Sequence, residues 1–194
     1  MELAASSRPD ADRLFAVAAA QAGLFTTQQA AEVGYSSQLL VHHVRARRFA
    51  RVQRGIYRLV HYPPVDDEEF VAAWLWSGRA GVVSHATALA LHGLSDVLPA
   101  HVHLTLPDFG RRRRLRAPSG VTVHFAIVAP DERTWHGAVP ITNVRRTLAD
   151  CARDGFAPDL LQQAAAQALQ RGLVARSELA EVDVALAPFG GLGT

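Results

Sequence analysis

The stretch that decides the fold is residues 23–60, GLFTTQQAAEVGYSSQLLVHHVRARRFARVQRGIYRLV. It contains two helical segments with Ser or Thr at their starts, separated at Gly34, and then a segment in which apolar and polar residues alternate around Arg54 and Gly55. Such alternation around a turn predicts a β-hairpin. An amphipathic segment at 11–22 adds a helix before these elements. Helix, helix, short turn, helix and basic hairpin is the order of a winged helix-turn-helix.

Positive charge is concentrated in the same part of the chain. From Ser36 to Tyr62 there are six arginines, three histidines and no acidic residue. The chain has no lysine, so all 20 basic residues are arginines, whose planar guanidinium groups suit phosphate oxygens and guanine edges. A bias of genomic base composition would give the same arginine usage without any function. Pro63 and Pro64, followed by the acidic run at 66–69, then mark a boundary.

We therefore expect two domains, a winged helix-turn-helix DNA-binding domain in residues 1–62 and a C-terminal α/β domain in residues 65–190. In the second domain, strands are expected at 102–107 and 121–127, and a third at 139–142, among segments with helical periodicity. The predicted fold class is α/β (α+β), with the C-terminal helices arranged around a small β-sheet.

The third helix of the first domain is expected to read DNA. At 100° per residue, Leu39, Leu40 and Val44 face the other helices, and the opposite face is small, polar and cationic. On such a face glutamine can pair with adenine, arginine with guanine, and valine can touch a thymine methyl group. The hairpin would meet sugar-phosphate or the minor groove. A solvated face without a ligand is the alternative. The residues expected to contact DNA are Thr27, Ser36, Ser37, Gln38, Val41, His42, Arg45, Arg48, Arg51, Gln53, Arg54 and Arg58.

A second basic cluster lies between two of the expected strands. It consists of Arg111, Arg112, Arg113, Arg114 and Arg116. A contact to DNA phosphates, a docking patch for an acidic partner and a solvated loop are the three interpretations that the sequence leaves open.

Composition predicts a cytoplasmic protein. The single cysteine, Cys151, cannot form an internal disulfide, which fits a reducing compartment. The apolar run near the N-terminus follows Asp10, Asp12 and Arg13, so we interpret it as a helix and not as a signal peptide. The sequence contains no uncharged apolar stretch of the length of a membrane span, and we expect no membrane partner.

No catalytic or metal-binding pattern is evident in the sequence. Cys151 has no recognisable base or oxyanion site, and we expect neither catalytic residues nor a cofactor. Of the nine histidines, none has a ligand partner at metal-binding spacing. His85 and His92 are therefore interpreted as packing or capping residues of a helix, and no metal ion is expected.

Taken together, these motifs resemble a known family. Residues 23–60 resemble the N-terminal winged helix-turn-helix of the AbiEi-type antitoxins of type IV, or abortive-infection, toxin–antitoxin systems, whose hairpin ends in Arg-Gly-Val-Tyr. Here residues 54–57 read Arg-Gly-Ile-Tyr. VVSHATALALHGL at 82–94 and VPITNVRRTLADCAR at 139–153 are similar to later segments of the family. The resemblance extends over about residues 10–186.

The resemblance implies a regulator that is not an enzyme. Such a protein binds double-stranded operator DNA, represses its own operon and counters a nucleotidyltransferase-type toxin, and we expect a monomer or a weak dimer on repeated sites. An accessory protein of a mobile element or phage-defence system, whose winged module binds protein or RNA, is the alternative. A nuclease is disfavoured because the chain has no lysine for a carboxylate–lysine active site.

Overall fold

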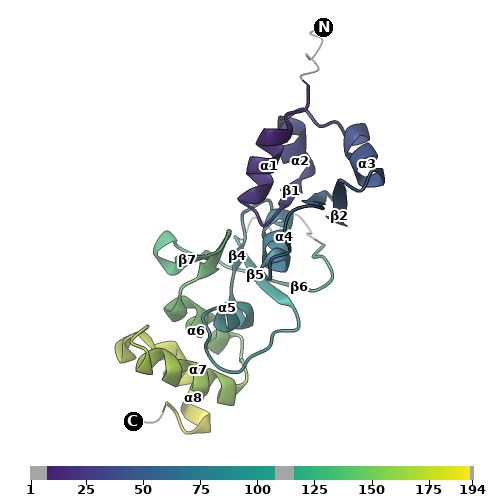
Figure 1. Cartoon of the computed structure of the whole chain (residues 1–194). Helices are drawn as coiled ribbons and strands as arrows, with labels where there is room; N and C mark the ends of the chain where they lie inside the picture. The colour runs from purple at the N-terminus through teal and green to yellow at the C-terminus, as the bar shows by residue number, and fades with distance from the viewer. Residues whose placement is uncertain (1–7, 108–115, 193–194) are drawn as a thin grey trace. The chain divides into compact units, whose positions relative to one another are not determined.

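The protein has two compact units, each with its own helices and sheet. The structure, a computed structural model, describes residues 8–107 and 116–192. The first unit ends at Arg79 and the second begins at Ala80 (Figure 1). Both units combine helices with strands, which confirms the predicted α+β class.

The first unit is a winged helix-turn-helix to which a fourth helix is added. Its three strands form an antiparallel sheet in the order β1-β3-β2. The core packs Leu14, Phe25 and Leu40 together, each at most 1% exposed. The elements are α1 (Ala11–Ala19), β1 (Leu24–Thr26), α2 (Thr27–Glu32), α3 (Ser37–Arg45), β2 (Phe49–Gln53), β3 (Ile56–Leu59) and α4 (Glu68–Trp76).

The local sequence explains where these helices begin. Thr26 caps α2 in a reciprocal arrangement with Gln29, in which each side chain bonds the backbone N–H of the other residue. The Ser36 hydroxyl accepts from the N–H of Leu39 at the start of α3. The cap of α2 is therefore Thr26, and the neighbouring Thr27 is the first residue of the helix.

Helix α4 belongs to the first unit, although the proline pair before it predicts a boundary. It packs against β1 and β3. Gln53 Nε2 donates to the carbonyl of Ala72 at 3.2 Å, and Arg58 Nε lies 2.9 Å from Glu68 Oε2. The compact first unit therefore includes α4 and extends to Arg79.

The second unit is built on a mixed five-stranded sheet in the order β6-β5-β4-β8-β7. The pairs β5–β6 and β4–β8 are parallel, and the other two neighbouring pairs are antiparallel. Its strands are β4 (Val82–Val83), β5 (Val102–Leu106), β6 (Val121–Phe125), β7 (Arg133–His136) and β8 (Val139–Thr142). The sequence predicted β5, β6 and β8, but β4 is only two residues long and β7 is mostly exposed, so neither shows a strand pattern.

Four helices bury their apolar sides together beside this sheet (Figure 1). Leu89, Leu148, Leu161 and Leu186, one from each helix, are at most 1% exposed. The helices are α5 (His85–Leu91), α6 (Val144–Arg153), α7 (Pro158–Gln170) and α8 (Ala180–Leu186), with short 3-10 turns η2 (Pro130–Glu132), η3 (Arg176–Glu178) and η4 (Ala187–Phe189). Among the described residues, none of the helices is long and apolar enough to cross a lipid bilayer.

Candidate nucleic-acid interface

Helix α3 has one side in the core and the other in solvent. Leu40 is buried, and Leu39 and Val44 are half-buried against the same core. His43 packs on the ring of Phe49 at 4.8 Å between centroids, and burial lowers the pKa of its imidazole. These contacts fix the rotation of the helix about its axis, so the residues between them must face outward.

The outward face of α3 is the one that the sequence predicted. Arg45 is exposed at the end of the helix, and Val41 is 49% exposed in its middle. A single exposed valine is ordinary on a protein surface and indicates no ligand by itself. The exposed residues of this face and its N-terminal cap are Ser36, Ser37, Gln38, Val41, His42 and Arg45.

A cationic surface surrounds the end of α3. Five exposed arginines lie in or beside α3 and the hairpin, and none of them forms an ion pair with a carboxylate of a described residue. We call these five the free arginines: Arg45, Arg47, Arg48, Arg51 and Arg54. Because no described carboxylate neutralises them, their guanidinium groups are available to an external anion.

Arg47 is a member of this surface that the sequence analysis did not predict. It has a φ of +54°, a left-handed conformation that commonly ends helices, and the next N–H, that of Arg48, donates to the carbonyl of His43. Helix α3 ends at Arg45, so Arg47 lies beyond it and has no place on the helical face that the sequence predicted.

The hairpin β2–β3 forms the wing, and its turn is tied to the start of α2. Gly55 has a φ of +78°, a conformation that favours glycine in the turn. Its carbonyl accepts from the N–H of Thr27 at 2.9 Å and from the Thr27 hydroxyl at 3.3 Å. Arg51 and Arg54 are exposed on the wing.

Three of the residues expected to contact DNA are engaged inside the unit instead. The Thr27 hydroxyl bonds Gly55, and the Gln53 amide bonds the backbone of α4. Arg58 pairs with Glu68 and also donates to the carbonyl of Tyr62, and only 20% of its side chain is exposed. Helix α4 supplies the partners of Gln53 and Arg58, namely the carbonyl of Ala72 and the carboxylate of Glu68. The sequence analysis had placed α4 in the other domain.

The second basic cluster is only partly described. Arg111, Arg112, Arg113 and Arg114 lie outside the described residues, and Arg116 is exposed. The described part of the chain therefore adds nothing to the three interpretations of this cluster.

The second unit contains a buried charge network next to Cys151. Asp150 is 4% exposed, and its Oδ1 accepts from Arg146 Nε and Arg153 Nη1, both at 2.8 Å, while its Oδ2 has no hydrogen-bond partner among the described residues. Burial raises the pKa of the Asp150 carboxyl and of the Cys151 thiol, whose side chain is in the core. A thiol buried in this way does not act as a nucleophile.

Comparison with known proteins agrees with the architecture of the first unit. Residues 12–60 match the model of a family described as "Transcriptional regulator, AbiEi antitoxin", which confirms the resemblance for this segment. No curated protein matches the chain. A crystal structure of the RV2827C protein from Mycobacterium tuberculosis is similar, with 16% sequence identity and a TM-score of 0.49, over 95% of this chain and 79% of that one.

Proposed function

We propose, from the premise that residues 12–60 are a winged helix-turn-helix of the AbiEi antitoxin regulator type, that the protein is a DNA-binding transcriptional regulator. In this proposal it represses its own operon and is the antitoxin of a type IV toxin–antitoxin pair. The observation that carries the proposal is the set of free arginines, which continues from the end of α3 onto the wing without a neutralising carboxylate among the described residues.

The two parts of this surface have different roles in the proposal. Helix α3 enters the major groove, where Gln38, Val41 and Arg45 meet base edges. The wing follows the backbone, where Arg51 and Arg54 contact phosphates or the minor groove. Contacts to phosphate release counterions and give affinity, whereas contacts to bases give sequence preference.

The partners and the compartment follow from the same proposal. A regulator of this type acts on double-stranded DNA in the cytoplasm, and its protein partner is a nucleotidyltransferase-type toxin. The cluster around Arg116 is a candidate contact for DNA or for that partner. The alternative is an accessory protein of a defence system or mobile element, and a neighbouring gene without a nucleotidyltransferase would favour it.

The direct test is a footprint of the full chain on the DNA upstream of its own gene. We expect protection of one site or of repeated sites, and loss of protection as salt rises, because phosphate contacts release counterions. A matched control is the variant in which Arg51 and Arg54 are both replaced by alanine. Equal protection of upstream and unrelated DNA by the unchanged protein at moderate salt would contradict the operator proposal.

The isolated first unit provides a second prediction. A fragment of residues 1–79 should fold and bind duplex DNA, whereas a fragment of residues 1–62 should be less stable. The shorter fragment lacks α4, which bonds Gln53 and pairs with Arg58, and a domain of about 60 residues buries only about 60% of its unfolded surface. Thermal unfolding by circular dichroism and DNA titration check both fragments. A folded 1–79 fragment without DNA affinity at low salt would contradict the assignment of DNA binding to this unit.

A further inference from the structure

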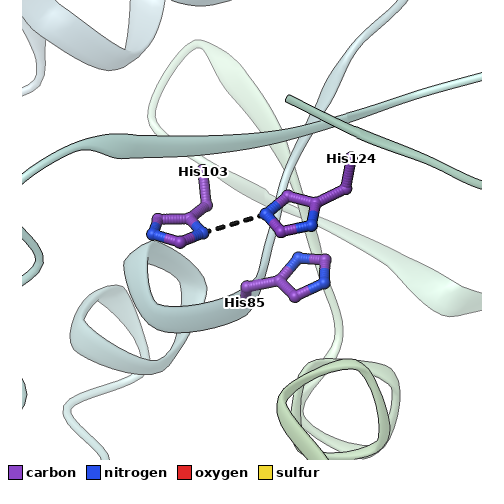
Figure 2. Close-up of side chains that lie close together, drawn as sticks. All are labelled: His85, His103 and His124. Carbon is purple, nitrogen blue, oxygen red and sulfur yellow. Dashed lines mark hydrogen bonds between the residues drawn. The ribbon is translucent and has the colours of Figure 1, made fainter. Parts of the chain in front are cut away.

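Three histidines that are far apart in the sequence meet in the second unit. His85 is the first residue of α5, and His103 and His124 lie on the neighbouring strands β5 and β6. Figure 2 shows the three rings beside one another. His103 Nδ1 is 3.0 Å from His124 Nε2, and the rings of His85 and His124 stack with their centroids 3.6 Å apart. The spacing of histidines along the sequence gave no sign of this histidine cluster, because each member comes from a different element.

Imidazole is a side chain that can bind metals. A neutral imidazole ring has one nitrogen with a lone pair, which is the ligand atom.

We propose that His85, His103 and His124 bind a divalent transition-metal ion that prefers imidazole ligands, with Zn²⁺ as the first candidate. One nitrogen from each ring lies within 4.8 Å of the other two. Two nitrogens bound to a tetrahedral zinc at 2.0–2.1 Å are about 3.3 Å apart, close to the 3.0 Å between His103 and His124. The His85 ring, which stacks on His124, has to turn as well as shift to bring a nitrogen to the same ion.

The groups around the rings orient them as the outer partners of metal ligands do. Asp154 Oδ2 lies 3.0 Å from His124 Nδ1, so that ring can donate to the carboxylate and turn its Nε2 toward His103. The Ser84 hydroxyl is 2.8 Å from His85 Nδ1 and 2.7 Å from the Thr105 hydroxyl, so it does not cap α5. A carboxylate or another fixed polar group on the second ring nitrogen is the usual companion of a histidine ligand. Asp154 is thus a positioning residue.

Charge and access also favour a cation. A cavity of about 390 Å³ opens beside His85 and His124, and the carboxylates of Asp150 and Asp154 line it. Asp150 Oδ2 has no hydrogen-bond partner among the described residues. Two arginines line the same cavity and oppose a cation, but both are paired: Arg146 with Glu132 and Asp150, and Arg153 with Asp150 and Glu181.

The test is a metal titration of the untagged full chain after removal of metals with a chelator. We expect one equivalent of Co²⁺ to bind with the visible absorption of a tetrahedral site, and Zn²⁺ to displace it. The ion joins α5 to β5 and β6, so saturation with Zn²⁺ should raise the melting temperature by several degrees.

Single substitutions assign the ligands. His103→Gln and His124→Gln should weaken Co²⁺ binding more than about 100-fold, and Asp154→Asn about 10- to 100-fold with the stoichiometry unchanged. The matched control is His101→Gln, which removes an exposed histidine two residues from His103 and should leave the affinity unchanged. Circular dichroism of each variant identifies any that fails to fold.

Two results would overturn the proposal. One is the absence of a saturable equivalent of Co²⁺ or Zn²⁺ in the unchanged protein, a measurement that needs no variant. The other is equal binding by folded His103→Gln and His101→Gln proteins, which would place the metal elsewhere. In either case the histidine cluster only packs the second unit. The DNA-binding proposal is not affected, because the footprint on DNA tests it separately.

Discussion

Replacing Arg146 with alanine should lower the free energy of unfolding of the second unit by about 3–5 kcal/mol, because the buried carboxylate of Asp150 loses its buried cation and keeps only the half-exposed Arg153. Arg146 is 8% exposed. It donates to Asp150 Oδ1 at 2.8 Å, to Glu132 Oε2 at 2.7 Å and to the carbonyl of Ile127 at 3.1 Å. Removing one partner of such a network costs far more than the net stability that the network adds.

The matched control is Arg145→Ala at the neighbouring position. The side chain of Arg145 is 42% exposed, and its nearest Glu132 oxygen is 3.9 Å away, so the loss should stay within about 1 kcal/mol. Urea unfolding of the full chain followed by circular dichroism measures both variants. Hydrogen exchange of the amides in α6 shows whether the loss lies in the second unit. If both variants lost similar free energies of unfolding, burial of the charge network would not be the reason that Arg146 stabilises the unit.

The second large effect is expected on DNA recognition. Arg45→Ala should cost about 1–3 kcal/mol of binding free energy on the operator and much less on a scrambled duplex, since Arg45 lies on the exposed face of α3 that we propose to meet base edges. Arg54→Ala, on the wing, should weaken both duplexes by similar factors. It should also lower the slope of log affinity against log salt by about one unit for each lost phosphate contact.

Titration of each variant against both duplexes at several salt concentrations measures these effects. Footprinting of the unchanged protein first supplies the operator. An Arg45→Ala protein that loses affinity equally for the two duplexes would show that α3 does not read sequence and that the docking geometry is wrong.

Local patterns predicted the first unit well because its determinants are local. The 3.6-residue period placed Leu40 inside and Arg45 outside, and the turn at Gly55 placed the wing. Strand β1 was missed because three residues are too few for alternation to show, and it exists because it pairs with β3. Strand β4 of the second unit was missed for the same reason, and β7 was missed because it is mostly exposed.

At the candidate sites, the contacts that the sequence did not predict join distant segments. A sequence pattern assigned Gln53 and Arg58 to DNA, and only the position of α4 shows that their polar groups bind within the unit. The histidine cluster depends on the parallel pairing of β5 with β6 and on the start of α5 beside them. None of these relations is encoded in a spacing along the chain.

The pairing of β4 has a consequence for the order in which the chain folds during synthesis. All strand pairs of the first unit lie between Leu24 and Leu59, whereas Val83 in β4 pairs with Ile141 in β8. At a synthesis rate of about 5–20 residues per second, several seconds separate the appearance of these two strands at the ribosome. Strand β4, at the centre of the second sheet, cannot pair with β8 until β8 has been synthesised. Non-local pairings of this kind form slowly. All strand pairs of the winged unit can therefore form before the second unit can complete its sheet.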